Sequence, residues 1–171
     1  MRIVVLVKPV PDPAAGGERL GPDGRLDRSA VPAVVNGNDE YALEAALKLI
    51  EAHGGEVILL SMAPGNAPET LRKALAMGAS SAVHVQDPAL EGSCTVSTTK
   101  VLAAALEALE FDLVLAGVDT SDGGAGVVPA GVATLRNLPY LSRTSKPLGL
   151  MRWTRTVSVS FRGSIFAAHE R

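Results

Sequence analysis

Short apolar runs alternate with helical segments along most of this chain, and this alternation limits the possible folds more than any other feature. Residues 2–7, 56–62, 81–85 and 112–117 are runs typical of strands buried on both faces of a sheet. The intervening segments repeat apolar residues with the period of a helix. The pattern therefore predicts an α/β fold of three layers, a parallel sheet with helices on both faces and right-handed crossovers. The helical stripes are Ala42, Ala45, Ala46, Leu49 and Ile50; Leu71, Leu75 and Ala76; and Val101, Leu102, Ala105, Leu106 and Leu109.

Polar residues and glycines mark the expected helix ends. Asn38 is predicted to cap a helix over 39–53, with two carboxylates in its first turn. Asn66, with Glu69 three residues later, resembles a capping box. Gly54 and Gly78 follow the last turns of their helices, where a glycine commonly ends a helix.

Length and charge restrict the class of protein. A chain of 171 residues accommodates one domain with a sizeable core. Its net charge of −2 argues against a nucleic-acid partner, and its apolar runs are too short to insert into a membrane. One cysteine, Cys94, and no pattern of a signal peptide predict a cytoplasmic protein.

Two regions interrupt the alternation. Residues 8–35 form a long connection with five of the eleven prolines, and Asp23-Gly24 within it predicts a small hairpin over 19–28. A connection of that length inside a compact domain is usually functional or partly disordered. The tail over 146–171 alternates apolar and polar residues at 151–163, which predicts an edge hairpin.

The segment after the fourth apolar run, GVDTSDGGAGVVP, is the strongest candidate for a ligand site. Its glycines, Gly117, Gly123, Gly124 and Gly126, allow backbone N–H groups to converge beside the start of the next helix, an arrangement that suits a phosphate. The same glycines also fit a turn that merely reverses the chain. The segment is neither a Walker loop nor a GxGxxG fingerprint.

Side chains in the same loop extend this hypothesis. Thr120 and Ser121 add hydroxyl donors, whereas Asp119 and Asp122 would repel a phosphate unless they face ribose hydroxyls or an amino group.

Other candidates follow the first two runs, and each has a simpler interpretation. Lys8 can neutralise a phosphate or be a solvated surface lysine. Asn36, Asn38 and Asp39 precede a helix and can be caps alone. Met62 can lie against an adenine ring or belong to the core.

Catalytic and metal chemistry find little support. His53, His84 and His169 have no carboxylate or cysteine at ligand spacing, so we expect no metal site. No G-x-S-x-G elbow is present, and Cys94 is most simply an inert thiol. We therefore expect no catalytic residue.

The segments RIVVLVKPVPD, NDEYALEAAL, PETLRKALAMGAS with AVHV, and DLVLAGVDTSDGGAGVVPAGVA resemble, in order and spacing, the β subunit of electron transfer flavoprotein. The resemblance covers residues 1–145. It implies an adenine nucleotide alpha hydrolase-like (Rossmann-like) fold and an electron carrier rather than an enzyme. It also implies a structural AMP, and an electron transfer flavoprotein alpha subunit as partner that holds most of the FAD. Flavoprotein dehydrogenases are the implied electron donors.

The resemblance also implies which residues hold the AMP. Contacts at Gly126, Val127 and Val128 are expected mainly through the backbone. The expected residues are Leu6, Lys8, Asn36, Gly37, Asn38, Asp39, Met62, Gly117, Asp119, Thr120, Ser121, Asp122, Gly123, Gly124, Ala125, Gly126, Val127 and Val128.

Residues 146–171 depart from the family pattern and are expected to form a truncated or divergent tail of the same domain. Two rival hypotheses remain. One is a stand-alone adenine-nucleotide module of the universal-stress type, whose phosphate loop would need a glycine where Thr120 stands. The other is an interaction domain without a ligand.

Overall fold

A mixed six-stranded sheet forms the centre of the computed structural model, which describes residues 1–28, 30–143 and 157–161. The strand order is β5-β4-β1-β6-β8-β7. The strands β1 (Arg2–Leu6), β4 (Glu56–Met62), β5 (Ser81–Val85) and β6 (Leu113–Gly117) are parallel. They match the four predicted runs to within one residue at each end, because continuous apolar runs suit strands buried on both faces.

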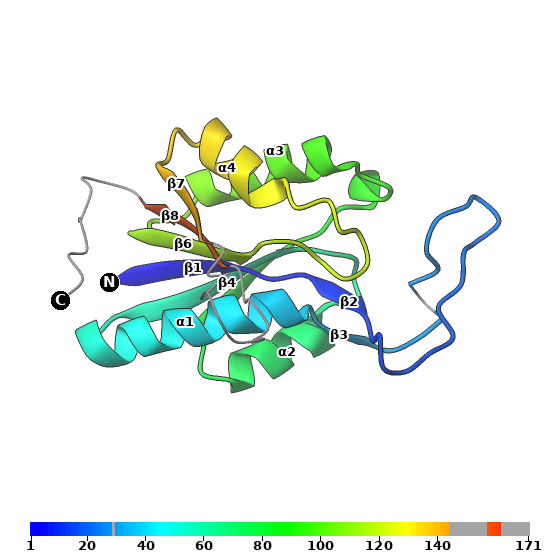
Figure 1. Cartoon of the computed structure of the whole chain (residues 1–171), viewed down its shortest axis with the longest axis horizontal. Coiled ribbons are helices and arrows are strands. Elements are labelled where there is room, and N and C mark those ends of the chain that lie inside the picture. The colour runs from blue at the N-terminus through cyan, green and yellow to red at the C-terminus, as the bar shows by residue number, and fades with distance from the viewer. Residues whose placement is uncertain (29, 144–156, 162–171) are drawn as a thin grey trace, which may run out of the picture.

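Helices cover both faces of this sheet, which completes the predicted three layers (Figure 1). The helices α1 (Gly37–His53) and α2 (Pro68–Ala76) cover one face, and α3 (Thr95–Glu107) and α4 (Val128–Leu135) cover the other. A short 3-10 helix, η1 (Pro88–Leu90), lies between β5 and α3. A separate ribbon pairs β2 (Pro9–Pro11) with β3 (Ala33–Val35), within the connection that was expected to contain only a hairpin over 19–28.

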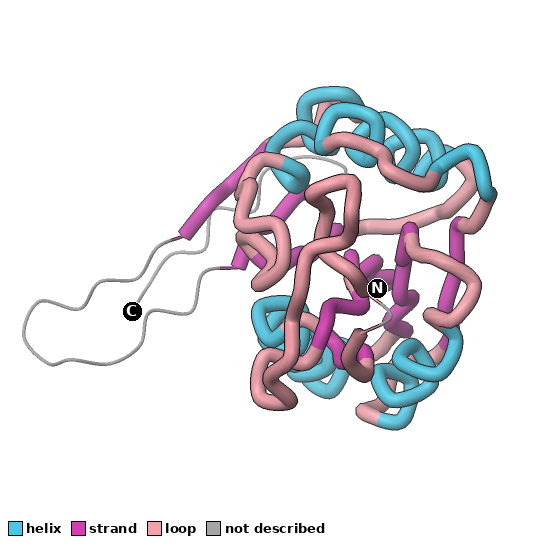
Figure 2. Tube along the Cα trace, turned by 90° about the vertical axis from the view of Figure 1, so that its right-hand side faces the viewer, coloured by secondary structure: helices cyan, strands magenta, loops and turns pink. Residues whose placement is uncertain are grey.

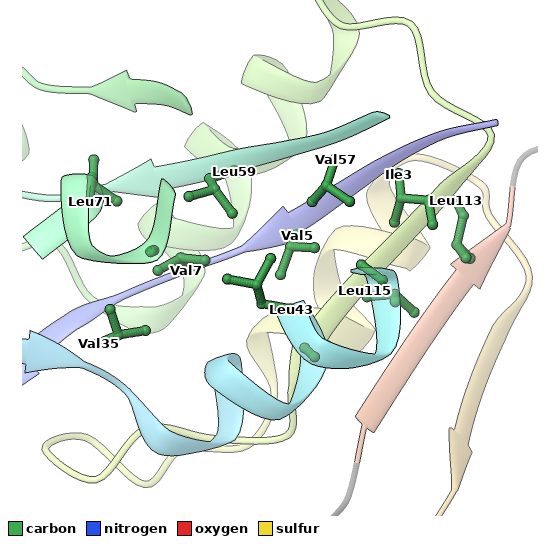
Figure 3. Close-up of a cluster of buried hydrophobic side chains, with 13 residues drawn as sticks. Ile3, Val5, Val7, Val35, Leu43, Val57, Leu59, Leu71, Leu113 and Leu115 are labelled. Atoms are coloured by element: carbon green, nitrogen blue, oxygen red, sulfur yellow. The ribbon is translucent and has the colours of Figure 1, made fainter. Parts of the chain in front are cut away.

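The core consists of two clusters, one on each side of the sheet. Ile3 and Val5 of β1 pack with Leu43 of α1 in the first cluster, which Figure 3 shows in close-up. Val4 and Leu6 point to the opposite face and pack in the second cluster, under α3 and α4. Alternate residues of one strand thus enter both clusters, as expected for a buried parallel strand.

Two predicted helix caps are wrong. The N-cap of α1 is Asn36, and Asn38 lies inside the first turn. The N-cap of α2 is Ala67, followed by Pro68, so Asn66 forms no capping box. Proline is well suited to the first helical position because its φ is already helical and its missing N–H is not needed there.

The predicted glycines after the helices are confirmed, because Gly54 and Gly78 follow α1 and α2 with φ of +72° and +127°. The hairpin predicted over 19–28 is confirmed by an antiparallel bridge between Leu20 and Leu26.

The predicted edge hairpin of the tail is partly wrong. The strand β8 (Val157–Phe161) lies inside the sheet, antiparallel to β6 on one side and to β7 (Tyr140–Arg143) on the other. Its hairpin partner therefore precedes the tail instead of lying within 151–163. The remaining residues of that prediction, 151–156 and 162–163, fall outside the described residues.

Candidate functional site

The candidate site lies where the strand order reverses. The chain moves from β1 to β4 and β5 on one side, and then to β6 on the other side of β1. Ligands of open α/β sheets bind outside the carboxyl ends of the strands at such a point. Lys8 follows β1 and the segment 118–127 follows β6, so the fold brings two predicted elements of the site together.

A buried carboxylate, Asp39, joins these strand ends to α1. Its side chain accepts a hydrogen bond from the backbone N–H of Lys8, with an N–O distance of 2.8 Å, and only 5% of the residue is exposed. Burial raises the pKa of Asp39 to about 7, although hydrogen bonds from Lys8, Asn36 and Gly117 act in the opposite direction. Asp39 therefore acts as a structural bridge beneath the site and is partly protonated near neutral pH.

Gly117 ends β6 directly against this bridge. A Cβ at this position would lie 2.8 Å from both the carbonyl carbon and the Cβ of Asn38 and would collide with the carboxylate of Asp39. The absence of a side chain at Gly117 thus allows the first turn of α1 to approach the end of β6.

Two asparagines connect α1 to the loop after β6. The side-chain amide of Asn36 donates to the carbonyl oxygen of Asp119 at 2.9 Å, and its oxygen accepts from the N–H of Ser121 at 3.2 Å. The amide of Asn38 donates to the carboxylate of Asp119 at 2.6 Å. Both side chains therefore hold the loop after β6 in place, and neither caps the N-terminus of α1.

Asp122, in the same loop, pairs with two cationic side chains. Its side chain is 1% exposed and accepts a hydrogen bond from Lys8 Nζ at 2.9 Å and another from the guanidinium of Arg28. Burial alone would raise the pKa of Asp122, but hydrogen bonds from Lys8, Thr120 and Arg28 outweigh burial and lower it. The carboxylate is thus ionised and paired with both cations, and its single charge balances one of their two positive charges.

The glycines of the loop serve two different purposes. Gly124 and Gly126 adopt φ of +55° and +63°, the left-handed region that glycine favours. Gly123 and Gly124 close a turn by donating to the carbonyl of Thr120 at 3.3 and 2.8 Å. The loop then leads through Ala125 to α4, whose N-cap is Val127.

A pocket of about 620 Å³ opens beside the loop, between the β2–β3 ribbon and the start of α1. Its charged lining within the described residues comes from Asp12, Glu40 and Asp119, and Tyr41 also lines it. Seven residues expected from the family resemblance line it: Asn36, Gly37, Asn38, Asp119, Thr120, Ser121 and Gly124.

Other expected residues lie elsewhere. Leu6, Met62 and Val128 pack in the core cluster under α3 and α4, and none of them lines the pocket. Val127 is 54% exposed at the start of α4. Contacts of these residues with a nucleotide stay predictions.

Sequence reasoning missed Arg28. The residue lies in the long connection 8–35, whose length is typical of a functional or partly disordered loop, but nothing in its local pattern indicates that it pairs with a residue 94 positions later. One signal is available in the sequence: Asp122 stands in a loop expected to bind phosphate, and a carboxylate there needs a cation beside it.

The fold and the site together define a Rossmann-like α/β protein with a candidate ligand site at the topological switch point. No helix within the described residues is both long and apolar enough to cross a membrane. The family model "Electron transfer flavoprotein domain" matches residues 23–160, past the point where the resemblance was expected to end. The chain belongs to the electron transfer flavoprotein family.

Several curated relatives agree with this assignment. The chain is 42% identical over 146 residues to "Electron transfer flavoprotein subunit beta" of Mycobacterium leprae, covering 82% of this chain and 55% of the relative. It is 39% identical over 168 residues to "Protein FixA" of Azorhizobium caulinodans, covering 95% of this chain and 59% of the relative. The chain thus spans little more than half the length of these relatives.

Proposed function

We propose that this chain is the nucleotide-binding part of an electron transfer flavoprotein β subunit. In this proposal it binds AMP at the switch point, pairs with an α subunit that carries FAD, and helps to relay electrons from flavoprotein dehydrogenases without being an enzyme itself. The observation that carries the proposal is the loop after β6, which Lys8, Asn36 and Asn38 hold at the switch point of a chain belonging to this family. The predicted compartment is the cytoplasm.

The residues of the site fit an adenine nucleotide. A Cβ built at Gly124 meets nothing within 4 Å, so the backbone is open to a ligand on that side. Thr120 and Ser121 supply hydroxyls at the pocket wall, and the carboxylates of Asp119 and Glu40 are suitable acceptors for ribose hydroxyls or an adenine amino group. We expect AMP to bind more tightly than ADP, with its phosphate at the N–H groups around 123–126.

The chain offers less to a flavin ring. It has three Phe, two Tyr and one Trp, and of these only Tyr41 lines the pocket within the described residues. Ring stacking and directed hydrogen bonds are the usual means by which proteins hold and tune a flavin. This scarcity supports an arrangement in which the α subunit holds most of the FAD.

The proposal is tested by purifying the chain without added nucleotide, denaturing it and identifying the released small molecules by mass spectrometry. Released AMP supports the proposal. Released ATP would favour a stand-alone module of the universal-stress type, and a protein without any nucleotide, before or after incubation with AMP, would favour an interaction domain without a ligand.

A further inference from the structure

Residues 12–28, which follow β2, make contacts of their own. At their start, the N–H of Asp12 donates to the carbonyl of Pro32 at 2.9 Å. They contain the hairpin bridged at Leu20 and Leu26, which an ion pair between Arg19 and Asp27 at 3.0 Å reinforces. In Figure 1 this segment extends beyond the carboxyl ends of the parallel strands, and Figure 2 shows the molecule from that side.

Two arginines connect this segment to loops from different strands. The guanidinium of Arg28 binds Asp122 in the loop after β6. The guanidinium of Arg25 lies against Gly92, in the connection from β5 to α3, so closely that a Cβ at Gly92 would collide with it. The strands β4 and β1 lie between β5 and β6 in the sheet. The segment 12–28 therefore contacts loops on both sides of the central strands, across their carboxyl edge.

The Arg28 contact is the stronger of the two because its partner is buried. Only 1% of the Asp122 side chain is exposed, whereas 44% of the Arg28 side chain is, so Arg28 reaches the carboxylate from the solvent side. Lys8, on the end of β1, binds the other carboxylate oxygen. A charge-assisted hydrogen bond to a desolvated carboxylate is stronger than an ordinary surface ion pair.

The same carboxylate belongs to the candidate phosphate loop, two residues before Gly124. Release of Arg28 would remove the contact of the segment 12–28 with this loop, while Lys8 would still neutralise Asp122 and keep the loop in place. Asp12 and Pro13 of the segment line the pocket, so the segment borders the candidate site.

We propose that residues 12–28 are a strap that Arg28 fastens across the carboxyl edge of the sheet, and that its opening limits the rate at which a bound nucleotide leaves. Arg28 is a positioning residue in this proposal. The gating of nucleotide release rests on the proposed function, whereas the fastening of the strap does not.

The test compares Arg28→Gln with wild type and with Lys48→Gln. The control removes the same charge from an exposed ion pair on α1, between Lys48 and Glu44, which makes no contact with the strap in the ion pairs of the described residues. Without nucleotide, the rate of trypsin cleavage after Arg25 is followed by mass spectrometry, because cleavage reports the population of the open segment. In parallel, dissociation of N-methylanthraniloyl-AMP is followed by fluorescence after addition of excess AMP.

We expect Arg28→Gln to accelerate both cleavage and dissociation roughly tenfold, the order expected for loss of one charge-assisted hydrogen bond. Lys48→Gln should change neither rate. Arg28→Lys keeps the positive charge, so its two rates should lie between those of wild type and those of Arg28→Gln. Cleavage within twofold of wild type would overturn the strap. Faster cleavage with unchanged dissociation would overturn the gating alone. Failure of wild type to bind the probe would remove the gating and the proposed function together, while cleavage would still decide whether Arg28 fastens the strap.

Discussion

Substitution Gly117→Ala tests the close packing beneath the candidate site. The new Cβ would lie 2.8 Å from two atoms of Asn38, whereas ordinary contacts begin near 3.4 Å, so the start of α1 must retreat by about 0.6 Å, the difference. Overpacking of this kind costs about 1–3 kcal/mol. The retreat also stretches the 2.8 Å hydrogen bond between Asp39 and the N–H of Lys8, and loss of a hydrogen bond to a charged group costs about 1.5–3 kcal/mol. The two costs add to an expected loss of about 2.5–6 kcal/mol in the free energy of unfolding.

Gly37→Ala is the matched control, because Gly37 begins α1 and a Cβ there meets nothing within 4 Å. Alanine favours the helix, so this variant should be unchanged or stabilised by up to about 1 kcal/mol. Urea unfolding of both variants measures the difference as a shift in midpoint, with a slope of roughly 2 kcal/mol/M. Equal stabilities of Gly117→Ala and Gly37→Ala would refute the close approach of α1 to β6.

Two further predictions concern acidity and association. The raised pKa of Asp39, about 7 in the folded protein against 3.8 ordinarily, means that the folded state binds a proton that the unfolded state lacks between these pH values. The free energy of unfolding should therefore fall by at most about 1.4 kcal/mol per pH unit from this group as pH rises from about 4 to 7, and level off above. Asp39→Asn should remove that slope in urea unfolding. An unchanged slope would assign it to other groups. The isolated chain should be colourless and self-associate in light scattering, because Leu135 and Tyr140 are exposed near the sheet edge. It should show a flavin absorption band only after coexpression with an α-type subunit; a monomer that purifies with stoichiometric FAD would contradict this.

The sequence predicted the parallel part of the fold well, because buried strands leave a signal within five to seven consecutive residues. Arg2–Leu6 and Glu56–Met62 are apolar on both faces, and no other element needs to be known to identify them. The position of β8 depends instead on pairing with β6 and β7, which are distant in sequence. Local alternation cannot specify such a partner.

The sequence predicted where the candidate site lies, but not which contacts its polar side chains make. The loop after β6 and the start of α1 follow from the rule for open sheets, and glycines at Gly124 and Gly126 fit their left-handed φ. The roles of the polar side chains depended on tertiary contacts. Asn36 holds the loop instead of capping α1 by its side chain, and Arg28 pairs with Asp122 from a segment that has no local motif.

Titration of the purified chain with AMP, by isothermal calorimetry, tests the central claim most directly when it includes Gly124→Val and Gly54→Val. Both glycines have positive φ, +55° and +72°, and a Cβ at either meets nothing within 4 Å, so valine strains the backbone at both without a steric clash. Gly54 follows α1 at the other end of the molecule. The account predicts that wild type and Gly54→Val bind AMP with similar affinity and that Gly124→Val does not bind it. Equal affinity of all three proteins, or no binding by wild type, would contradict the account.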